Sequence, residues 1–274
     1  MAKAVREIMT KPRVLVLRTA GTNCDRETAF AFELAGAETE FVHINELTAR
    51  RRELNDYHIL ALPGGFTYGD DIASGKILAN ELTYKLEDSL QKFVSDGKLI
   101  IGICNGFQIL VKAGLLPNIS GDFQTIEATL TLNDSNKFED RWVYLKKLKS
   151  KCVWTEKTDK IIHLPVAHGE GKFIPRDNKV LKILKDNDMI ALEYVDGSEH
   201  KCGYPCNPNG SVENIAGICD KTGRIFGLMP HPERHISFYQ SPYWTKNKNK
   251  LSNRGEGDGF SIFANGVNFA KKHL

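Results

Sequence analysis

The amino-acid sequence predicts an α/β protein with a mostly parallel sheet, helices on both of its faces, and a smaller antiparallel β portion. Short, fully apolar runs have the composition of strands buried on both faces. Over about the first hundred residues these runs alternate with segments of helical periodicity, which is typical of right-handed βαβ units. Beyond Leu116 the apolar residues instead recur with period two, as in half-exposed antiparallel strands.

The first half of the chain supplies the parallel strands, which we expect at residues 14–17, 40–44, 57–62 and 98–103. Asn23 or Asp25 is expected to cap a helix that Gly36 ends. Its apolar positions, which we expect to pack inward, are Ala29, Phe30, Phe32 and Leu34. Further helices are expected at residues 77–95 and 105–113. Because ligands bind at the carboxyl ends of parallel strands, the loops after Leu17 and Leu62 and the turn at Cys104 should lie together.

The second half predicts strands at residues 124–132, 142–145, 161–168, 189–195, 215–219 and 224–229, and a closing helix at about 259–272. Residues 241–257 are polar and rich in Lys and Asn, so we expect a mobile loop there. The length of 274 residues allows one or two domains, and no internal repeat is evident.

Composition excludes several classes of protein. The 274 residues carry a formal net charge of +3, which is too small to indicate nucleic-acid binding. The basic clusters at residues 50–52, 146–151 and 246–250 are interpreted as solvated faces. No window is apolar enough for a membrane span, and no secretory signal is evident, so we expect a cytoplasmic protein. In a cytoplasmic protein we expect the six cysteines to form no disulfide framework. The segment Cys202-Gly-Tyr-Pro-Cys206 is at most half of a zinc motif, and we interpret it as a loop with incidental thiols.

Cys104 is the first candidate functional residue. It stands between an apolar strand and a helix, flanked by Gly102 and Gly106, which allow a sharp turn and close backbone packing. This is the pattern of a nucleophile elbow, where the helix N-terminus favours a thiolate. The alternative is a small buried cysteine with no chemical role. Cys24 also precedes a helix, but no His-x-Glu or glycine frame accompanies it.

Two further motifs suit the same chemistry. Gly64 and Gly65 follow a buried strand, so a backbone N–H there and that of Asn105 can form an oxyanion hole; a plain tight turn is the alternative. His231 and Glu233 follow a late strand in Pro-His-Pro-Glu, where extended chain puts both side chains on one side. A carboxylate beside an imidazole fixes its tautomer and stabilises its cation.

Together these motifs resemble the class I, or triad, glutamine amidotransferases, whose elbow reads Gly-x-Cys-x-Gly-x-Gln, as residues 102–108 do here. The fold implied is the flavodoxin-like one of that class. The sequence is most similar to the family of glutaminase subunits of phosphoribosylformylglycinamidine synthase. The stretches that carry this resemblance span nearly the whole chain, at residues 19–27, 63–70, 165–171, 207–211 and 227–234. The resemblance therefore implies one domain over residues 1–274.

The resemblance implies a glutaminase in which Cys104 attacks glutamine, His231 transfers protons and Glu233 orients His231. Oxyanion and glutamine contacts would come from Gly64, Gly65, Asn105, Gln108 and His168, the last of which is otherwise a structural histidine. No cofactor or metal is expected in this chain. A separate synthetase subunit would bind ATP and Mg²⁺ and use the ammonia, and a small third subunit would bridge the two.

Two other readings remain open from the residues. The chain is alternatively another triad amidotransferase or cysteine amidohydrolase of the same fold, which would be fully active without a partner. The second alternative is a non-catalytic subunit that senses glutamine. In that case a glutamine-derived electrophile would fail to label Cys104.

Overall fold

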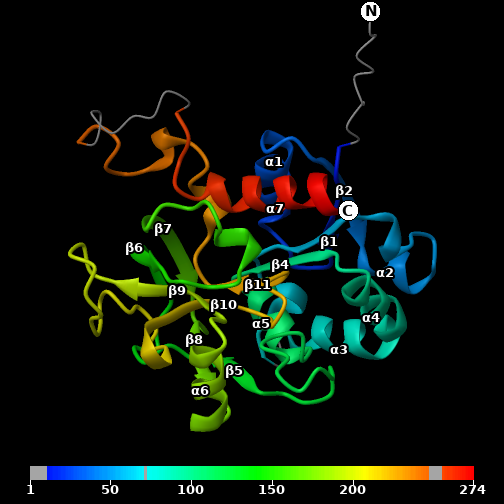
Figure 1. The fold of residues 1–274 in the computed structure, drawn as a ribbon, viewed down its shortest axis with the longest axis horizontal. Coiled ribbons are helices and arrows are strands. Elements are labelled where there is room, and N and C mark those ends of the chain that lie inside the picture. The colour runs from blue at the N-terminus through cyan, green and yellow to red at the C-terminus, as the bar shows by residue number, and fades with distance from the viewer. Residues whose placement is uncertain (1–10, 71–72, 247–254) are drawn as a thin grey trace, which may run out of the picture.

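The computed structural model describes residues 11–70, 73–246 and 255–274, and its main feature is a nine-stranded sheet with the order β2-β1-β3-β4-β11-β10-β9-β6-β7 (Figure 1). One half is parallel and consists of β2 (Glu38–His43), β1 (Arg13–Arg18), β3 (Ile59–Leu62), β4 (Leu99–Ile103) and β11 (Ile225–Leu228). The other half is antiparallel and consists of β10 (Ile215–Cys219), β9 (Ile190–Val195), β6 (Glu139–Lys147) and β7 (Ile161–His168).

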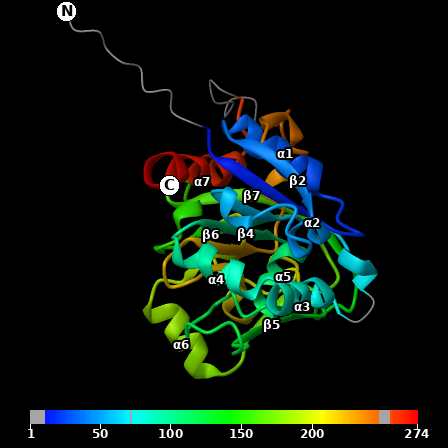
Figure 2. The same ribbon diagram turned by 90° about the vertical axis from the view of Figure 1, so that its right-hand side faces the viewer.

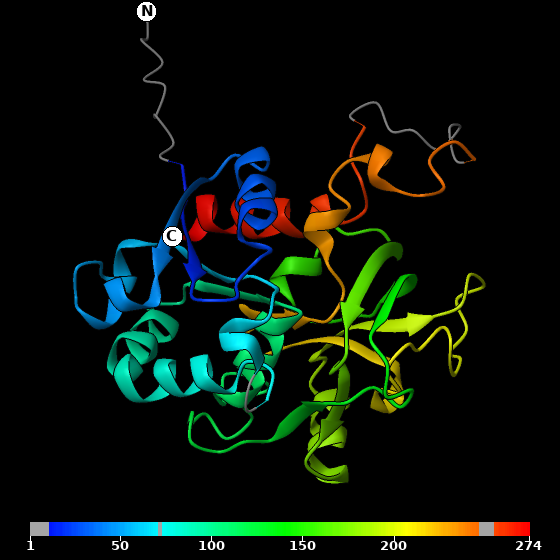
Figure 3. The same ribbon diagram turned by 180° about the vertical axis from the view of Figure 1, so that it is seen from behind.

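Helices cover both faces of the parallel half, which confirms the predicted fold class. On one face α1 (Asp25–Leu34) lies against α7 (Phe260–His273), and Figure 3 shows the pair from behind. On the other face lie α3 (Lys76–Lys85), α4 (Glu87–Ser95) and α5 (Asn105–Lys112), as Figure 2 shows. The remaining elements are α2 (Ile44–Thr48), α6 (Asn178–Asp186), and a small antiparallel sheet of β5 (Ala128–Thr131) and β8 (Lys172–Pro175).

The core lies between the sheet and these helices. The central strands β3 and β4 are buried along their whole length, as expected for fully apolar runs. The predicted inward packing of Phe30 and Leu34 is wrong, because their side chains are 57% and 52% exposed. Phe30 and Leu34 are four residues apart and therefore share one face of the helix. The buried face of α1 carries Thr28, Ala31 and Phe32 instead.

Some predicted boundaries also differ. The helix expected at 77–95 is two helices, which meet at Leu86. Glu87 and Asp88 then lie in the first turn of α4, where acidic residues favour a new N-terminus. The strand expected at 124–132 shortens to β5, and β8 and α6 were not predicted. Of the expected mobile loop, residues 247–254 lie outside the described residues.

Cys202 and Cys206 form a disulfide, which corrects their interpretation as incidental thiols. The turn between them, where the N–H of Cys206 donates to the carbonyl of Gly203, brings their Cα atoms to 5.9 Å. That separation lies within the range that a disulfide spans. The other cysteines, Cys24, Cys104, Cys152 and Cys219, are free and buried.

Gly106, in the first turn of α5, allows that helix to pack directly on the end of β3. A Cβ atom added there would lie 1.9 Å from the carbonyl oxygen of Leu62. Gly102 makes a similar close contact, because its added Cβ would lie 2.5 Å from the carbonyl oxygen of Gly106. Both glycines are therefore required by packing, and together they fix where the residue between them, Cys104, stands.

We predict that Gly106→Ala lowers the free energy of unfolding by about 2–3 kcal/mol or prevents folding, because the methyl group overlaps backbone that cannot retreat. Urea denaturation followed by circular dichroism measures this effect. Gly203→Ala is the matched control, since nothing lies within 4 Å of an added Cβ at that position. Equal urea midpoints for Gly106→Ala and the unaltered chain would contradict the packing argument.

Candidate active site

Cys104 is the residue on which the candidate site is built. It follows β4, precedes the first residue of α5, and has φ 52° and ψ −106°, a conformation that a non-glycine residue adopts at a cost. Its N–H donates to the carbonyl of Leu228 at 2.8 Å, which ties the turn to the end of β11. Its side chain is buried, and Sγ lies 3.7 Å from the carbonyl oxygen of Ala167.

His231 reaches the same place because β11 runs parallel to β4, with Leu228 paired to Ile103. The chain leaving β11 therefore emerges beside the elbow at Cys104. The N–H of His231 donates to the carbonyl of Pro165 at 2.8 Å, which holds the backbone there. Nδ1 of His231 lies 2.6 Å from Oε1 of Glu233, and both side chains are buried.

The electrostatics of this pair favour a charged imidazole. Burial by itself lowers the pKa of His231, but the adjacent Glu233 carboxylate and the Cys104 and Cys24 thiols outweigh it and raise that pKa well above its usual value. Because the carboxylate engages Nδ1, Nε2 is the nitrogen left for proton transfer. The arrangement can hold, accept and return a proton beside a thiol.

Cys104 and His231 open onto one cavity of about 230 Å³. It is lined by Asn23, Cys24, Gly65, Phe66, Cys104, Phe138, Asp140, Ala167, His231 and Arg234. The rings of Phe66 and Phe138 are half exposed, and their centroids lie 6.3 Å apart. Of the residues predicted for the site, the structure therefore places Cys104, His231 and Gly65 on the wall of the cavity, with Glu233 behind His231.

Asn105 and Gln108 support this wall from the elbow helix. Oδ1 of Asn105 accepts a hydrogen bond from Thr67 Oγ1 at 2.8 Å, and its Nδ2 donates to Gln108 Oε1 at 2.9 Å. Gln108 Nε2 donates in turn to the carbonyl of Glu170 at 2.6 Å. These bonds join the loop after β3, the elbow helix and the turn after β7. Asn105 is also the first residue of α5 and directly follows Cys104.

His168 supports a turn and is not on the wall of the cavity. Its Nδ1 lies 3.1 Å from Asn133 Oδ1, which also accepts from the N–H of Gly171 at 2.9 Å. The ring fills the space beside Gly171, where an added Cβ would lie 2.4 Å from it. Burial lowers the pKa of His168 to about 3, so the ring stays neutral.

Cys24 and Arg234 lie at the cavity although the site prediction did not include them. Cys24 follows β1, and the sequence analysis had placed the loop after that strand beside the elbow, which was the available signal. Burial raises the pKa of the Cys24 thiol, which works against its use as a nucleophile. Among the described residues, Cys24, His231 and Glu233 form a group whose ligand atoms lie within 4.8 Å of one another.

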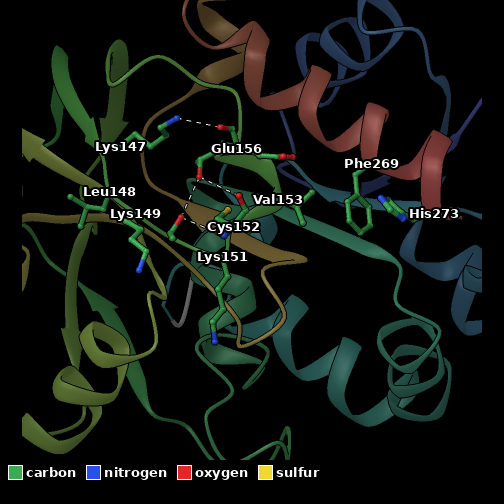
Figure 4. Close-up of a pocket in the computed structure, with 11 residues that line it drawn as sticks. Lys147, Leu148, Lys149, Lys151, Cys152, Val153, Glu156, Phe269 and His273 are labelled. Atoms are coloured by element: carbon green, nitrogen blue, oxygen red, sulfur yellow. Dashed lines mark hydrogen bonds between the residues drawn. The ribbon is translucent and has the colours of Figure 1, made fainter.

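A second cavity, of about 450 Å³, lies between the segment after β6 and α7 and shares no residue with the first (Figure 4). Two lysines of this cavity either donate hydrogen bonds to backbone carbonyl groups or extend into solvent. Lys147 Nζ donates to the carbonyl oxygens of Glu156 and Thr158, and Lys149 is 90% exposed and pairs with Asp188. These contacts agree with the interpretation of the basic cluster at residues 146–151 as a solvated face. No helix among the described residues has the length and apolarity to cross a membrane.

Comparisons with known proteins place this geometry in a class. Residues 11–270 match the family described as the CobB/CobQ-like glutamine amidotransferase domain. The chain resembles a chain of the PurLQS structure from Thermotoga maritima, with a TM-score of 0.70, 34% identity, and coverage of 95% of this chain and 99% of that one. The glutaminase domain of Trypanosoma brucei CTPS shares the fold, with a TM-score of 0.57 at 12% identity and coverage of 94% of each chain. The protein is a glutamine amidotransferase.

Relatives define the family within that class. The phosphoribosylformylglycinamidine synthase subunit PurQ of Dehalococcoides mccartyi is 49% identical over 96% of this chain and 100% of its own length. The subunit of the same name from Methanococcus maripaludis is 45% identical over 97% of this chain and 100% of its own length. The chain belongs to the family of PurQ subunits of phosphoribosylformylglycinamidine synthase.

We predict that the neutral, buried ring of His168 makes the protein less stable in mild acid. Between pH 6.5 and its folded pKa of about 3, His168 is protonated in the unfolded chain and neutral in the folded one, so the free energy of unfolding falls as the pH falls. At pH 5 this residue accounts for about 2 kcal/mol of loss.

Urea denaturation at pH 7 and pH 5 tests this prediction. His168→Gln keeps a donor for Asn133 without a titrating ring, so it should lose about 2 kcal/mol less between the two pH values. His200→Gln changes an exposed histidine and serves as the control. Equal losses in His168→Gln and the unaltered chain would rule out the buried neutral histidine as the cause.

Proposed function

We propose that this chain is the glutaminase subunit of a cytoplasmic phosphoribosylformylglycinamidine synthase in de novo purine biosynthesis. It hydrolyses glutamine to glutamate and delivers ammonia to a synthetase subunit. That subunit uses ATP to convert formylglycinamide ribonucleotide to formylglycinamidine ribonucleotide. The observation that carries this proposal is the cavity that Cys104 and His231 both line, with Glu233 Oε1 2.6 Å from Nδ1 of His231. The full-length family relationship supports the choice of synthase.

The chemistry follows from the positions of these three residues. The Cys104 thiolate attacks the side-chain amide carbon of glutamine, and His231 gives its proton to the departing nitrogen as the carbon–nitrogen bond breaks. Ammonia leaves and a glutamyl thioester remains. His231 then takes a proton from water, whose oxygen displaces the Cys104 sulfur and yields glutamate. Glu233 keeps Nδ1 protonated and offsets the positive charge on the ring.

Backbone groups at the cavity stabilise the negative oxygen in this proposal. The N–H of Asn105 belongs to the first residue of α5, next to Cys104, and that of Gly65 belongs to the loop after β3, at the wall of the cavity. Losing one such donor typically costs about 10²–10³ in rate. Gly64 lets the loop approach the ring of His231, and Gln108 and His168 hold the surrounding turns in place.

In this proposal the chain only hydrolyses glutamine, and partner subunits carry out the step that uses the ammonia. Attachment of ammonia to the amide substrate requires ATP, and we assign ATP and Mg²⁺ to the synthetase subunit. A small third subunit bridges the two proteins. We propose that residues 1–274 form one glutamine amidotransferase domain, because β10 and β9 extend the same sheet that carries the site.

We predict that Cys104→Ala abolishes glutamate release from glutamine, since no other group in the proposed mechanism attacks the amide. The assay uses the purified chain with and without the candidate synthetase subunit, and the unaltered chain should be strongly stimulated by that partner. Cys152→Ala, at a buried cysteine outside the cavity, should keep full activity. Release that survives Cys104→Ala would refute the proposed nucleophile.

We predict that Glu233→Gln lowers kcat by about 10²-fold or more while KM for glutamine changes little. The amide keeps the shape of the carboxylate, but it neither compensates the imidazolium charge nor fixes the required tautomer. Steady-state kinetics over a range of glutamine concentrations separate the two constants. A rise in KM at unchanged kcat would instead assign Glu233 to substrate binding.

A further inference from the structure

The disulfide between Cys202 and Cys206 is a feature that the proposed mechanism does not use. It lies in the loop after β9, and its two cysteines are separated by only 4 positions in the sequence. A disulfide stabilises a fold mainly by restricting the unfolded chain, and it does so least when the loop that it closes is short. In the reducing cytoplasm that we propose for this chain, disulfides are more often redox-sensing than structural. Both points indicate a role other than stabilising the fold as a whole.

The disulfide can be reached from solvent. Both of its cysteines are half-buried, and the three residues between them, Gly203, Tyr204 and Pro205, are exposed. The four free cysteines of the chain are buried instead. Thiol–disulfide exchange requires a thiolate to reach one of the two sulfur atoms, so access decides which bonds are reduced. A small dithiol can therefore attack this bond while the core stays closed.

Tyr204, inside the loop that the disulfide closes, contacts the main sheet. Its hydroxyl accepts a hydrogen bond from Arg141 Nη2 at 2.9 Å, and Cζ of Arg141 lies 4.8 Å from the centroid of its ring. Arg141 lies on β6 and also pairs with Glu139, whose buried carboxylate accepts from Ser135 Oγ at 2.6 Å. The disulfide keeps the Cα atoms of its cysteines 5.9 Å apart and so limits the conformations that the tyrosine can adopt. The closed loop therefore holds the arginine at the start of β6.

The start of β6 forms part of the wall of the active-site cavity. Phe138 and Asp140 both line this cavity. Asp140 is also paired with Ala167 on β7, whose carbonyl oxygen lies 3.7 Å from Sγ of Cys104. Arg141 directly follows Asp140 in the chain, so a change in its contacts is transmitted to the wall that faces the nucleophile.

The turn after Cys206 anchors the same loop a second time. Nδ2 of Asn207 donates to the carbonyl of Ser211 at 2.9 Å, which closes the turn. The N–H of Phe173 on β8 donates to Ser211 Oγ at 3.0 Å, and the N–H of Asp134 donates to the carbonyl of Asn209 at 3.2 Å. These bonds attach the turn to β8 and to the segment before β6. The disulfide thus lies between two anchors, and the contact of Tyr204 is the anchor that the closed loop itself contains.

We propose that Cys202 and Cys206 form a thiol–disulfide switch, whose reduction by a dithiol frees Tyr204 from Arg141 and loosens the cavity wall at residues 138–140. One thiolate of the dithiol attacks a cysteine sulfur, the S–S bond breaks, and the other cysteine leaves and takes up a proton. The second thiol of the reagent then displaces the first cysteine. Two electrons and two protons reach the cysteines, and the dithiol becomes a cyclic disulfide. The inference rests on the proposed function for the activity that the switch alters.

The KM for glutamine, measured with the candidate synthetase subunit before and after treatment with dithiothreitol, tests this switch. Reduction should raise the KM about twofold to fivefold, as expected for the loss of a cation–π contact near the surface, while kcat changes less. The chain is first oxidised with glutathione disulfide, and alkylation followed by mass spectrometry counts its thiols. This count should be four before reduction and six after it. Six thiols in the oxidised sample would refute the proposal.

Matched variants separate the switch from other effects of the reagent. The double variant Cys202→Ser with Cys206→Ser should show the raised KM with or without dithiothreitol, which also corrects for any reaction of Cys104. Tyr204→Ala should show the raised KM with its disulfide intact and should respond little to reduction. Tyr84→Ala removes another exposed tyrosine, on α3 and outside the cavity, and should respond to reduction as the unaltered chain does.

A second readout is independent of turnover. Backbone amide hydrogen exchange in residues 134–141 should become at least about threefold faster on reduction, because the segment loses its contact with Tyr204. If the proposed function fails, no form of the chain releases glutamate, yet the exchange rates still decide whether the disulfide controls this segment. Unchanged exchange after complete reduction would show that the disulfide is only structural. An unchanged KM in an active enzyme, or a normal KM in Tyr204→Ala, would also overturn the proposal.

Discussion

The parallel pairing of β4 with β11 is the interaction on which the site depends. These strands are far apart in the sequence, yet their carboxyl ends lie side by side, and the N–H of Cys104 completes the ladder with the carbonyl of Leu228. A shift of this register would separate the thiol from the imidazole. The antiparallel half of the sheet contributes as well, because Pro165 on β7 anchors the backbone of His231. Cys104 and His231 are thus held by main-chain hydrogen bonds, which are less easily deformed than side-chain contacts.

Close backbone contacts make this framework rigid. Gly102 and Gly106 bring the elbow helix onto β3 and β4, and Gly64 brings the loop after β3 onto the ring of His231. The side chain of Asn105 then joins that loop to the helix, and Gln108 joins the helix to the turn after β7. The strained backbone of Cys104 is therefore supported on several sides. Strain of this kind persists only where the surrounding structure fixes it.

Local signals made much of this arrangement predictable. The elbow, the paired glycines and the His-x-Glu motif are each contained in a few residues, and the rule for parallel sheets assembles them at one edge. Cys24 was missed as part of the site because its position near His231 depends on how β1 and β11 are placed on either side of β3 and β4, which no short motif encodes. Phe30 and Leu34 were misplaced because apolar spacing alone does not say which face of α1 meets the sheet. The signal for α6 was present, since Asp177 accepts from the N–H of Val180 as a helix cap.

The aromatic rim of the cavity has a consequence for its product. Phe66 and Phe138 are half exposed, their ring centroids lie 6.3 Å apart, and both line the space of about 230 Å³. The faces of these two rings offer water no hydrogen bonds, whereas Asn23, Asp140 and Arg234 line the same space with polar groups. Ammonia is a nucleophile only while its lone pair carries no proton. The two rings therefore form the part of the wall at which the released nitrogen meets no protonated side chain.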